Sequence, residues 1–181
     1  GCILICPSGA LTENSKVIGQ VQSGVSGSVC VITGVLNTGE ESGEPIIKKL
    51  IRHAMEETNR PVFIDCPPGS ACIVMESIKD ADFCVLAAEP TVFGASNLKM
   101  AVELVRLFGK KHGVVLNKCL DEDNPSERFC LENDVPILGR IPYDAELGHI
   151  NGRGEIAVQV SGKYRALFSE LLDTVKKEAC L

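Results

Sequence analysis

Residues 62–69 run Val62-Phe63-Ile64-Asp65-Cys66-Pro67-Pro68-Gly69. An apolar run that ends in a carboxylate and a proline-stiffened turn predicts a buried strand with a loop at its carboxyl end. Nucleoside triphosphatases use such an acid to hold Mg²⁺, through water, because the bound ion keeps several of its waters. Gly69 offers a backbone N–H that approaches a γ-phosphate without a Cβ in the way. Asp65 taken alone is better explained as a helix cap in a tight turn, but the whole string favours a nucleotide-binding site.

Outward from this string, apolar runs alternate with segments of helical period. Strands are expected at 29–36, 61–66, 82–88, 114–116 and 136–141, and helices at 44–58, 70–79, 95–109, 125–133 and 161–178. The later strands are continuous apolar runs, which is typical of strands covered on both faces. The alternation predicts an α/β fold, a mostly parallel sheet with helices on both faces. Residues 20–28 are rich in Gly and Ser and indicate a loop or a weak hairpin.

Composition excludes several classes of protein. The 181 residues carry 18 Lys and Arg against 24 Asp and Glu, a net charge of −6, which argues against a nucleic-acid or polybasic membrane binder. No apolar run approaches the ~20 residues that span a bilayer. The nine cysteines are odd in number and several lie in apolar segments, which favours buried thiols in a reducing compartment. We therefore expect a cytoplasmic protein that binds neither nucleic acid nor membrane.

Polar residues follow two further expected strands, where ligands bind in open parallel sheets. Asn117 and Lys118 come directly after 114–116, and the donor and acceptor of an Asn amide match the N6/N7 edge of adenine. Pro142 and Asp144 follow 136–141, in a stiff loop suited to one wall of a base pocket. A turn Asn and a plain turn are the alternatives at these two places. The string Gly-x-x-x-x-Gly-Lys-Ser/Thr, which marks a phosphate-cradling P-loop, is absent from the sequence.

Two cysteines near the start form a separate pattern. Cys2-x-x-x-Cys6-Pro7 is similar to the end of a ferredoxin cluster motif, in which the last cysteine is followed by proline. Two thiolates in one chain do not close a four-iron cluster. Two ordinary cysteines near one end of the chain are therefore the alternative interpretation.

Together these strings resemble the MinD/ParA class of P-loop ATPases, and more narrowly its members with an inserted ferredoxin domain. The resemblance rests on six strings in order: Cys2-x-x-x-Cys6-Pro-x-Gly-Ala, Gly34-x-Leu-x-x-Gly39-Glu40, Asp65-x-Pro-Pro-Gly-Ser, Glu89-Pro-Thr-x-Phe-Gly, Asn117-Lys118 and Ile141-Pro142-x-Asp144. The pair Asp-x-Pro-Pro-Gly and Glu-Pro-Thr-x-Phe-Gly is the specific part of the match.

The resemblance implies ATP and Mg²⁺ as cofactors, with slow hydrolysis that drives a two-state dimer. It implies catalytic roles for Asp65, at Mg²⁺ through water, and for Gly69, in a switch loop. It places Asn117 on the adenine, with Lys118, Pro142 and Asp144 also in the nucleotide site. It further implies 4Fe-4S clusters in the insert, with Cys2 and Cys6 as two ligands, and a redox partner.

The resemblance covers only the C-terminal part of such a protein. Residues 1–28 are expected to be the remnant of a ferredoxin-like insert with its linker, and residues 29–181 the C-terminal part of the nucleotide-binding domain. Without a P-loop this chain is not expected to hydrolyse ATP. Exposed strand edges would favour a homodimer or a complementing N-terminal segment. The alternative is a non-catalytic binding or assembly module, or an iron–sulfur-bridged dimer, with a vestigial nucleotide fold.

Overall fold

The computed structural model describes residues 2–56, 61–69, 72–120 and 122–180. They form two compact units, Gly1–Ile64 and Asp65–Leu181. The expected helix end at Thr58 and helix start at Ser70 lie outside the described residues. Among the residues that are described, no helix is long and apolar enough to cross a membrane.

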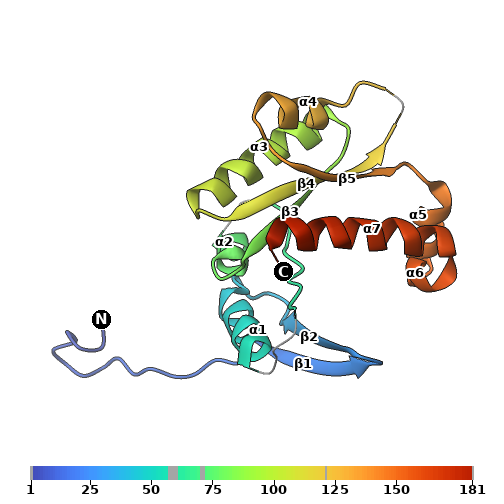
Figure 1. The fold of residues 1–181 in the computed structure, drawn as a ribbon. Coiled ribbons are helices and arrows are strands. Elements are labelled where there is room, and N and C mark those ends of the chain that lie inside the picture. The colour runs from blue at the N-terminus through green and yellow to red at the C-terminus, as the bar shows by residue number, and fades with distance from the viewer. Residues whose placement is uncertain (1, 57–60, 70–71, 121, 181) are drawn as a thin grey trace. The chain divides into compact units, whose positions relative to one another are not determined.

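The first unit contains an antiparallel hairpin of β1 (Gly19–Ser26) and β2 (Val29–Leu36) (Figure 1). Ser26 pairs with Val29, so the turn has two residues, and its Gly27 has a φ of 59°. This left-handed conformation suits glycine and matches the twist of a tight hairpin. The expected strand at 29–36 is confirmed in its bounds. Its expected place in the parallel sheet is wrong, because β2 pairs with β1.

Helix α1 (Glu44–Glu56) packs on one face of this hairpin through two glycines. A Cβ added to Gly34 would lie 2.4 Å from Ile46 Cγ2 and 2.9 Å from Leu50 Cδ1. A Cβ on Gly19 would lie 2.6 Å from Ile46 Cδ1. The missing side chains therefore let the helix approach the strands closely.

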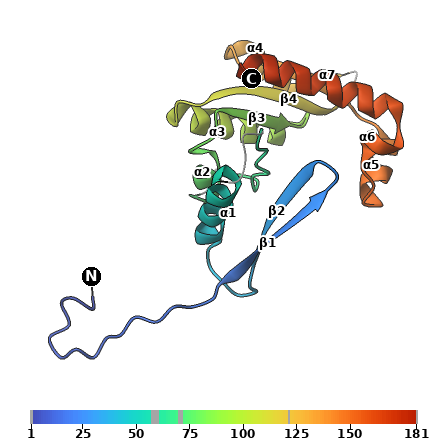
Figure 2. The same cartoon turned by 60° about the horizontal axis from the view of Figure 1, so that its bottom comes forward.

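The second unit is built on a parallel sheet with the strand order β3-β4-β5, formed by β3 (Phe83–Ala88), β4 (Lys111–Cys119) and β5 (Ile137–Pro142). Figure 2 shows α3 (Val92–Leu107) on one side of the sheet and α7 (Gly162–Ala179) on the other. The remaining helices are α2 (Cys72–Ile78), α4 (Pro125–Glu132), α5 (Ala145–Gly152) and α6 (Ala157–Val160). The expected α/β class, a parallel sheet flanked by helices, is confirmed.

Alternating side chains of β4 take part in two hydrophobic clusters, one on each face of the sheet. Val114 and Leu116 are fully buried and pack in one cluster with Leu98 and Val102 of α3. Val115, between them, packs on the opposite face with residues of β5 and α7. Because both faces are covered, β4 has the continuous apolar run that predicted it.

The expected strand at 61–66 is wrong. These residues form no strand, and the Phe63 side chain is 77% exposed. An apolar run becomes a strand only when a neighbouring strand accepts its backbone hydrogen bonds, and the segment joins neither sheet of the described chain. Helices α5 and α6 were not expected, since glycines at 148 and 152 interrupt the apolar pattern of α5 and α6 has only four residues.

Candidate functional site

The three parallel strands end on one edge of the sheet, and polar residues follow each of them. Ala88 pairs with Leu116, and Cys119 pairs with Pro142. Glu89, Asn117 and Tyr143 therefore lie at or just beyond the carboxyl ends of β3, β4 and β5. Helices α3, α4 and α5 begin on this edge too, and their N-termini carry partial positive charge. We call this region the carboxyl edge.

An ion pair joins two of the strand ends. Lys118 Nζ donates to Glu89 Oε1 at 2.7 Å, and both side chains are about half exposed. The carboxylate of Glu89 raises the pKa of Lys118, so this ammonium stays charged. The backbone of Lys118 has a φ of 55°, a conformation that non-glycine residues rarely adopt, and its N–H donates to Asn117 Oδ1 at 3.0 Å. The irregular end of β4 thus presents an amide and a cation side by side.

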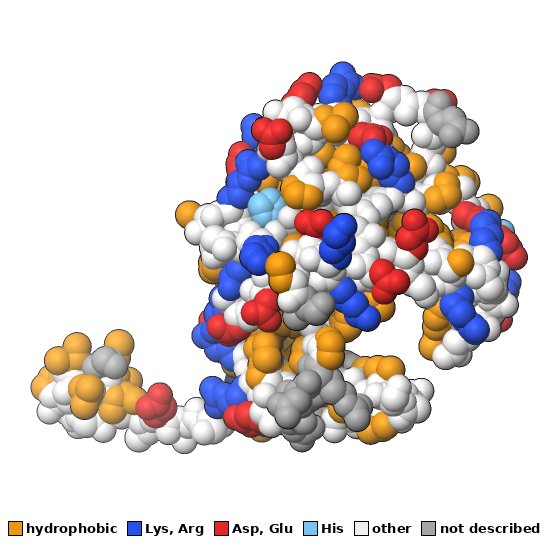
Figure 3. All heavy atoms as spheres, in the orientation of Figure 1, with side chains coloured by type: hydrophobic (Ala, Val, Ile, Leu, Met, Phe, Trp, Pro, Cys, Tyr) orange, Lys and Arg blue, Asp and Glu red, His pale blue; other side chains and the backbone are white. Residues whose placement is uncertain are grey.

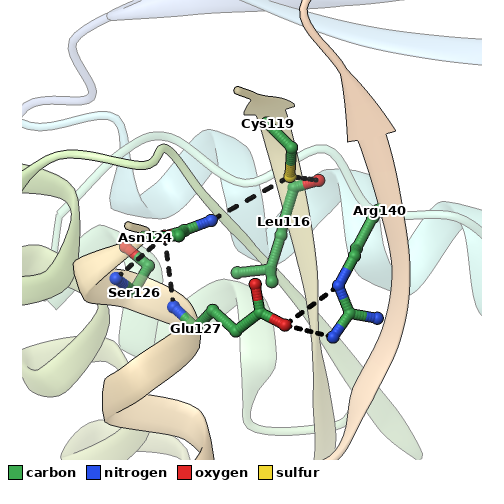
Figure 4. A network of polar contacts seen from close by, with 6 residues as sticks. All are labelled: Leu116, Cys119, Asn124, Ser126, Glu127 and Arg140. Atoms are coloured by element: carbon green, nitrogen blue, oxygen red, sulfur yellow. Dashed lines mark hydrogen bonds and ion pairs between the residues drawn. The ribbon is translucent and has the colours of Figure 1, made fainter. Parts of the chain in front are cut away.

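A partly buried polar network fixes α4 to the same edge (Figure 4). Asn124 caps the helix, since its Oδ1 accepts from Ser126 N at 3.0 Å and Glu127 N at 3.2 Å. The fully buried Ser126 hydroxyl donates to the backbone oxygen of Glu89 at 2.7 Å, which ties the loop after β3 to α4. Arg140 Nε donates to Glu127 Oε1 at 3.0 Å. The site's loops are therefore held by side chains from both neighbouring elements.

A second network surrounds Asp144 at the end of β5. Its Oδ1 caps α5 by accepting from Glu146 N at 2.9 Å and Leu147 N at 3.3 Å. Its Oδ2 accepts from Lys163 Nζ at 2.6 Å and from the Tyr164 hydroxyl at 2.9 Å. Lys163 first, and then Tyr164, lower the pKa of the Asp144 carboxyl to about 2. Burial and the two nearby carboxylates, Asp144 and Glu146, raise the pKa of Tyr164.

Asn117, Lys118, Pro142 and Asp144 are thus brought to one edge of the sheet. Cys66, the neighbour of Asp65, packs in a cluster with Cys84, the second residue of β3. That position lies at the amino end of β3, away from Glu89. The shared site of Asp65 and Asn117 stays a prediction.

Gly69 has a left-handed backbone conformation that favours glycine, and its predicted catalytic role stays a prediction. Its φ is +100°, and a Cβ built on it would have no heavy atom within 4 Å. The turn is therefore open for a close approach of another group to the backbone.

Cys2 and Cys6 lie in turns near the N-terminus. The hydrogen bond with Ser8 and the N–H of Ala10 lower the pKa of the Cys6 thiol to about 7. Hydrophobic side chains gather on the surface of this segment in Figure 3, and Leu4 is 91% exposed. Among the residues that the structure describes, no three His, Cys, Asp or Glu side chains are grouped to hold a metal ion.

Sequence reasoning missed several residues that hold this edge together. Asn124 carried a readable signal, since Asn followed by Pro is a typical start of a helix. Ser126, Lys163 and Tyr164 carried none, because their contacts join residues far apart in the chain.

No protein-family model matches the chain. Two uncharacterized proteins of Methanocaldococcus jannaschii are similar in sequence. MJ0579 is 25% identical over 155 residues, 86% of this chain and 54% of that protein. MJ0578 is 29% identical over 147 residues, 81% of this chain and 51% of that protein. The chain therefore spans about half the length of the curated relatives it matches.

Solved structures resemble the chain in fold. The cell division ATPase MinD of Pyrococcus furiosus matches with a TM-score of 0.61 and 22% identity, over 74% of this chain and 58% of that one. The MinD cell division protein of Aquifex aeolicus gives 0.59 and 18%, over 74% and 59%. The MinC:MinD complex of the same organism gives 0.58 and 18%, over 74% and 57%. The chain therefore has a MinD-like α/β fold.

Proposed function

We propose that this chain is part of a MinD/ParA-like, ATP-binding ATPase, and that its carboxyl edge receives the adenine end of ATP. The observation that carries the proposal is the position of Asn117 and Lys118, side by side where three helices begin, in a MinD-like sheet. The helix N-termini at this edge favour an anionic group such as the phosphates of the same ligand. The amide of Asn117 offers the donor and acceptor that adenine needs.

The remaining residues have distinct roles in this proposal. Pro142 and Asp144 form one wall of the base pocket, with Asp144 held by Lys163 and Tyr164 rather than by the ligand. Asp65 supplies a hard carboxylate oxygen of the kind that Mg²⁺ prefers, through water, and Gly69 supplies an accessible N–H. Bound Mg²⁺ would neutralise phosphate charge.

The sequence contains no P-loop string, and P-loop N–H groups and lysine hold the β- and γ-phosphates in such ATPases. We therefore propose that this chain alone does not hydrolyse ATP. A complementing N-terminal segment, or a second subunit, would supply the phosphate cradle. The outer edge of β3 is a suitable place for such a segment, since Val85 on that strand is 47% exposed.

Binding of fluorescent ATP and GTP analogues, followed by anisotropy with Mg²⁺ present, tests the nucleotide proposal. We expect ATP to bind more tightly than GTP, and Asn117→Ala to weaken ATP binding by about 10-fold, since a bidentate base contact is worth ~1–3 kcal/mol. Asn151→Ala, which changes an exposed Asn of α5, is the matched control. Equal ATP binding by the wild type and Asn117→Ala would overturn the proposal. Phosphate release by the isolated chain would contradict its inactivity.

The iron–sulfur association is a second candidate, supported by the lowered pKa of Cys6 beside Cys2. A thiolate is the form that binds iron. Anaerobic reconstitution, with iron and sulfide analysis and an absorption spectrum, tests it. Half a four-iron cluster per chain, lost in Cys6→Ala and kept in Cys180→Ala, would support a cluster bridging two chains. A chain that binds no iron would exclude this candidate and leave the ATP proposal untouched.

A further inference from the structure

The β1–β2 hairpin of the first unit contains no charged residue, although charged residues flank it on both sides. No Asp, Glu, Lys, Arg or His lies between Lys16 and Glu40, which themselves form an ion pair at 2.9 Å. The part of this hairpin that is visible in Figure 3 is orange and white. Proteins normally protect an edge strand with lysine, proline or an inward charge, because its open backbone groups pair readily with another chain. Neither β1 nor β2 has such protection.

Of the two strands, β2 has the stronger tendency to pair. Its residues Val29, Val31, Ile32, Thr33 and Val35 are all β-branched, whereas β1 consists mainly of Gly, Gln and Ser. Within the described part of the chain, no backbone hydrogen bond joins β2 to any segment other than β1. The outer edge of β2 therefore offers backbone donors and acceptors.

An apolar stripe runs along the same strand. Val29, Val31, Thr33 and Val35 share one face of β2, because side chains alternate along a strand. That face is opposite to the one on which Gly34 contacts α1. The exposed fractions of Val29, Val31 and Val35 are 58%, 52% and 40%. This face lacks the cover that α1 gives to the other.

We propose that β2 pairs antiparallel with β2 of a second copy of this chain and so makes one continuous sheet from two hairpins. Copies with a net charge of −6 repel each other, and the uncharged hairpin lets them meet without like charges in contact. A two-fold axis at Ile32 sets Val29 opposite the partner's Val35 and Val31 opposite the partner's Thr33. The two valine stripes then become continuous. This pairing is independent of the nucleotide proposal, which concerns the second unit.

Sedimentation velocity over a series of micromolar concentrations, with a thiol reductant present, tests the pairing. We expect the wild type to form a dimer whose population rises with concentration. The double variant Val31→Lys with Thr33→Lys places like charges opposite each other across the pair, and should raise the dissociation constant by at least about 10-fold. Val25→Lys adds a charge at a 78% exposed position on β1 and should leave the dimer intact.

A wild type that stays monomeric at every concentration would overturn the proposal. A double variant that dimerises like the wild type would overturn it too, because another surface would then form the dimer. Far-ultraviolet circular dichroism checks that the variants fold. If the double variant does not fold, amide hydrogen exchange of the wild type decides: exchange at 29–36 should slow as concentration rises, and the absence of any concentration dependence would refute the pairing.

Discussion

Asp144 uses its two carboxylate oxygens for different purposes. One caps α5, and the other holds Lys163 and Tyr164 of α7, so a single side chain joins the loop after β5 to the last helix. All of these contacts favour the ionised carboxyl. The proposed wall of the base pocket is therefore held in place by the charge of the Asp144 carboxylate, and this carboxylate does not need to contact the ligand.

This arrangement makes the free energy of unfolding depend on pH in the acid range. The pKa of Asp144 falls from 3.8 to about 2 on folding, so the folded state binds the proton less well. Its contribution is complete above a pH of about 4 and is lost as the pH falls towards about 2. We expect Asp144→Asn to flatten the loss of unfolding free energy in that window, measured by urea titration at stepped pH. Asp173→Asn, on the exposed side of α7, should retain the wild-type slope. Parallel pH profiles for all three proteins would refute the role of Asp144.

The start of α4 shows how one element is fixed by its first turn. Asn124 is buried, its side chain accepts from two backbone N–H groups, and Ser126 reaches across to the loop after β3. A cap lost here leaves buried donors without an acceptor, which costs more than at an exposed helix end. Loss of this cap should therefore destabilise both α4 and the carboxyl edge to which it is joined.

We expect Asn124→Ala to lower the unfolding free energy by about 1–2 kcal/mol, measured by denaturant titration. Asn124→Ser keeps an oxygen that accepts from the same N–H groups, and should recover most of the loss. An alanine variant as stable as the wild type would mean that the cap does not stabilise α4.

The close packing of β4 against β5 leads to a second prediction at this scale, for a glycine in β4. A Cβ on Gly113 would lie 2.7 Å from both Cγ and Cδ2 of the buried Leu138. Gly113→Ala should therefore cost about 1–3 kcal/mol of unfolding free energy. Gly148→Ala, in α5, meets no heavy atom within 4 Å and should be neutral or stabilising by up to about 1 kcal/mol. Calorimetric melting of the two variants compares them, and equal melting temperatures would contradict the packing argument.

At the scale of the whole molecule, the three hydrophobic clusters formed by the described residues all lie in the second unit. We expect residues 65–181 to fold without the first unit, with dispersed amide resonances and one cooperative thermal transition. Leu116→Ala in this fragment removes a fully buried side chain and should cost about 2–5 kcal/mol. Poorly dispersed amide resonances would show that this core does not form independently. A Leu116→Ala fragment with the same melting temperature as the unsubstituted fragment would show the same.

The sequence predicted those elements whose signals are local. The continuous apolar run of β4 and the amphipathic pattern of α3 are properties of their own residues. Asn117 was expected just after a strand, and it lies among the last three residues of β4. The failure at 61–66 had a different cause, since a strand depends on a neighbour that no local pattern reveals. The same holds for Tyr164, whose hydroxyl meets a carboxylate on another element. Contacts between distant segments are what the sequence alone did not supply.

The two tyrosines have an optical consequence. The chain contains no tryptophan and only Tyr143 and Tyr164, of which the first adjoins Asp144 in sequence and the second donates its hydroxyl to it. Tyrosine emission excited near 275 nm therefore comes from this one neighbourhood, with one ring exposed and the other buried. The protein thus carries a label-free fluorophore pair at the edge where we propose that ATP binds. Ligand docking there should change the intensity of this tyrosine emission.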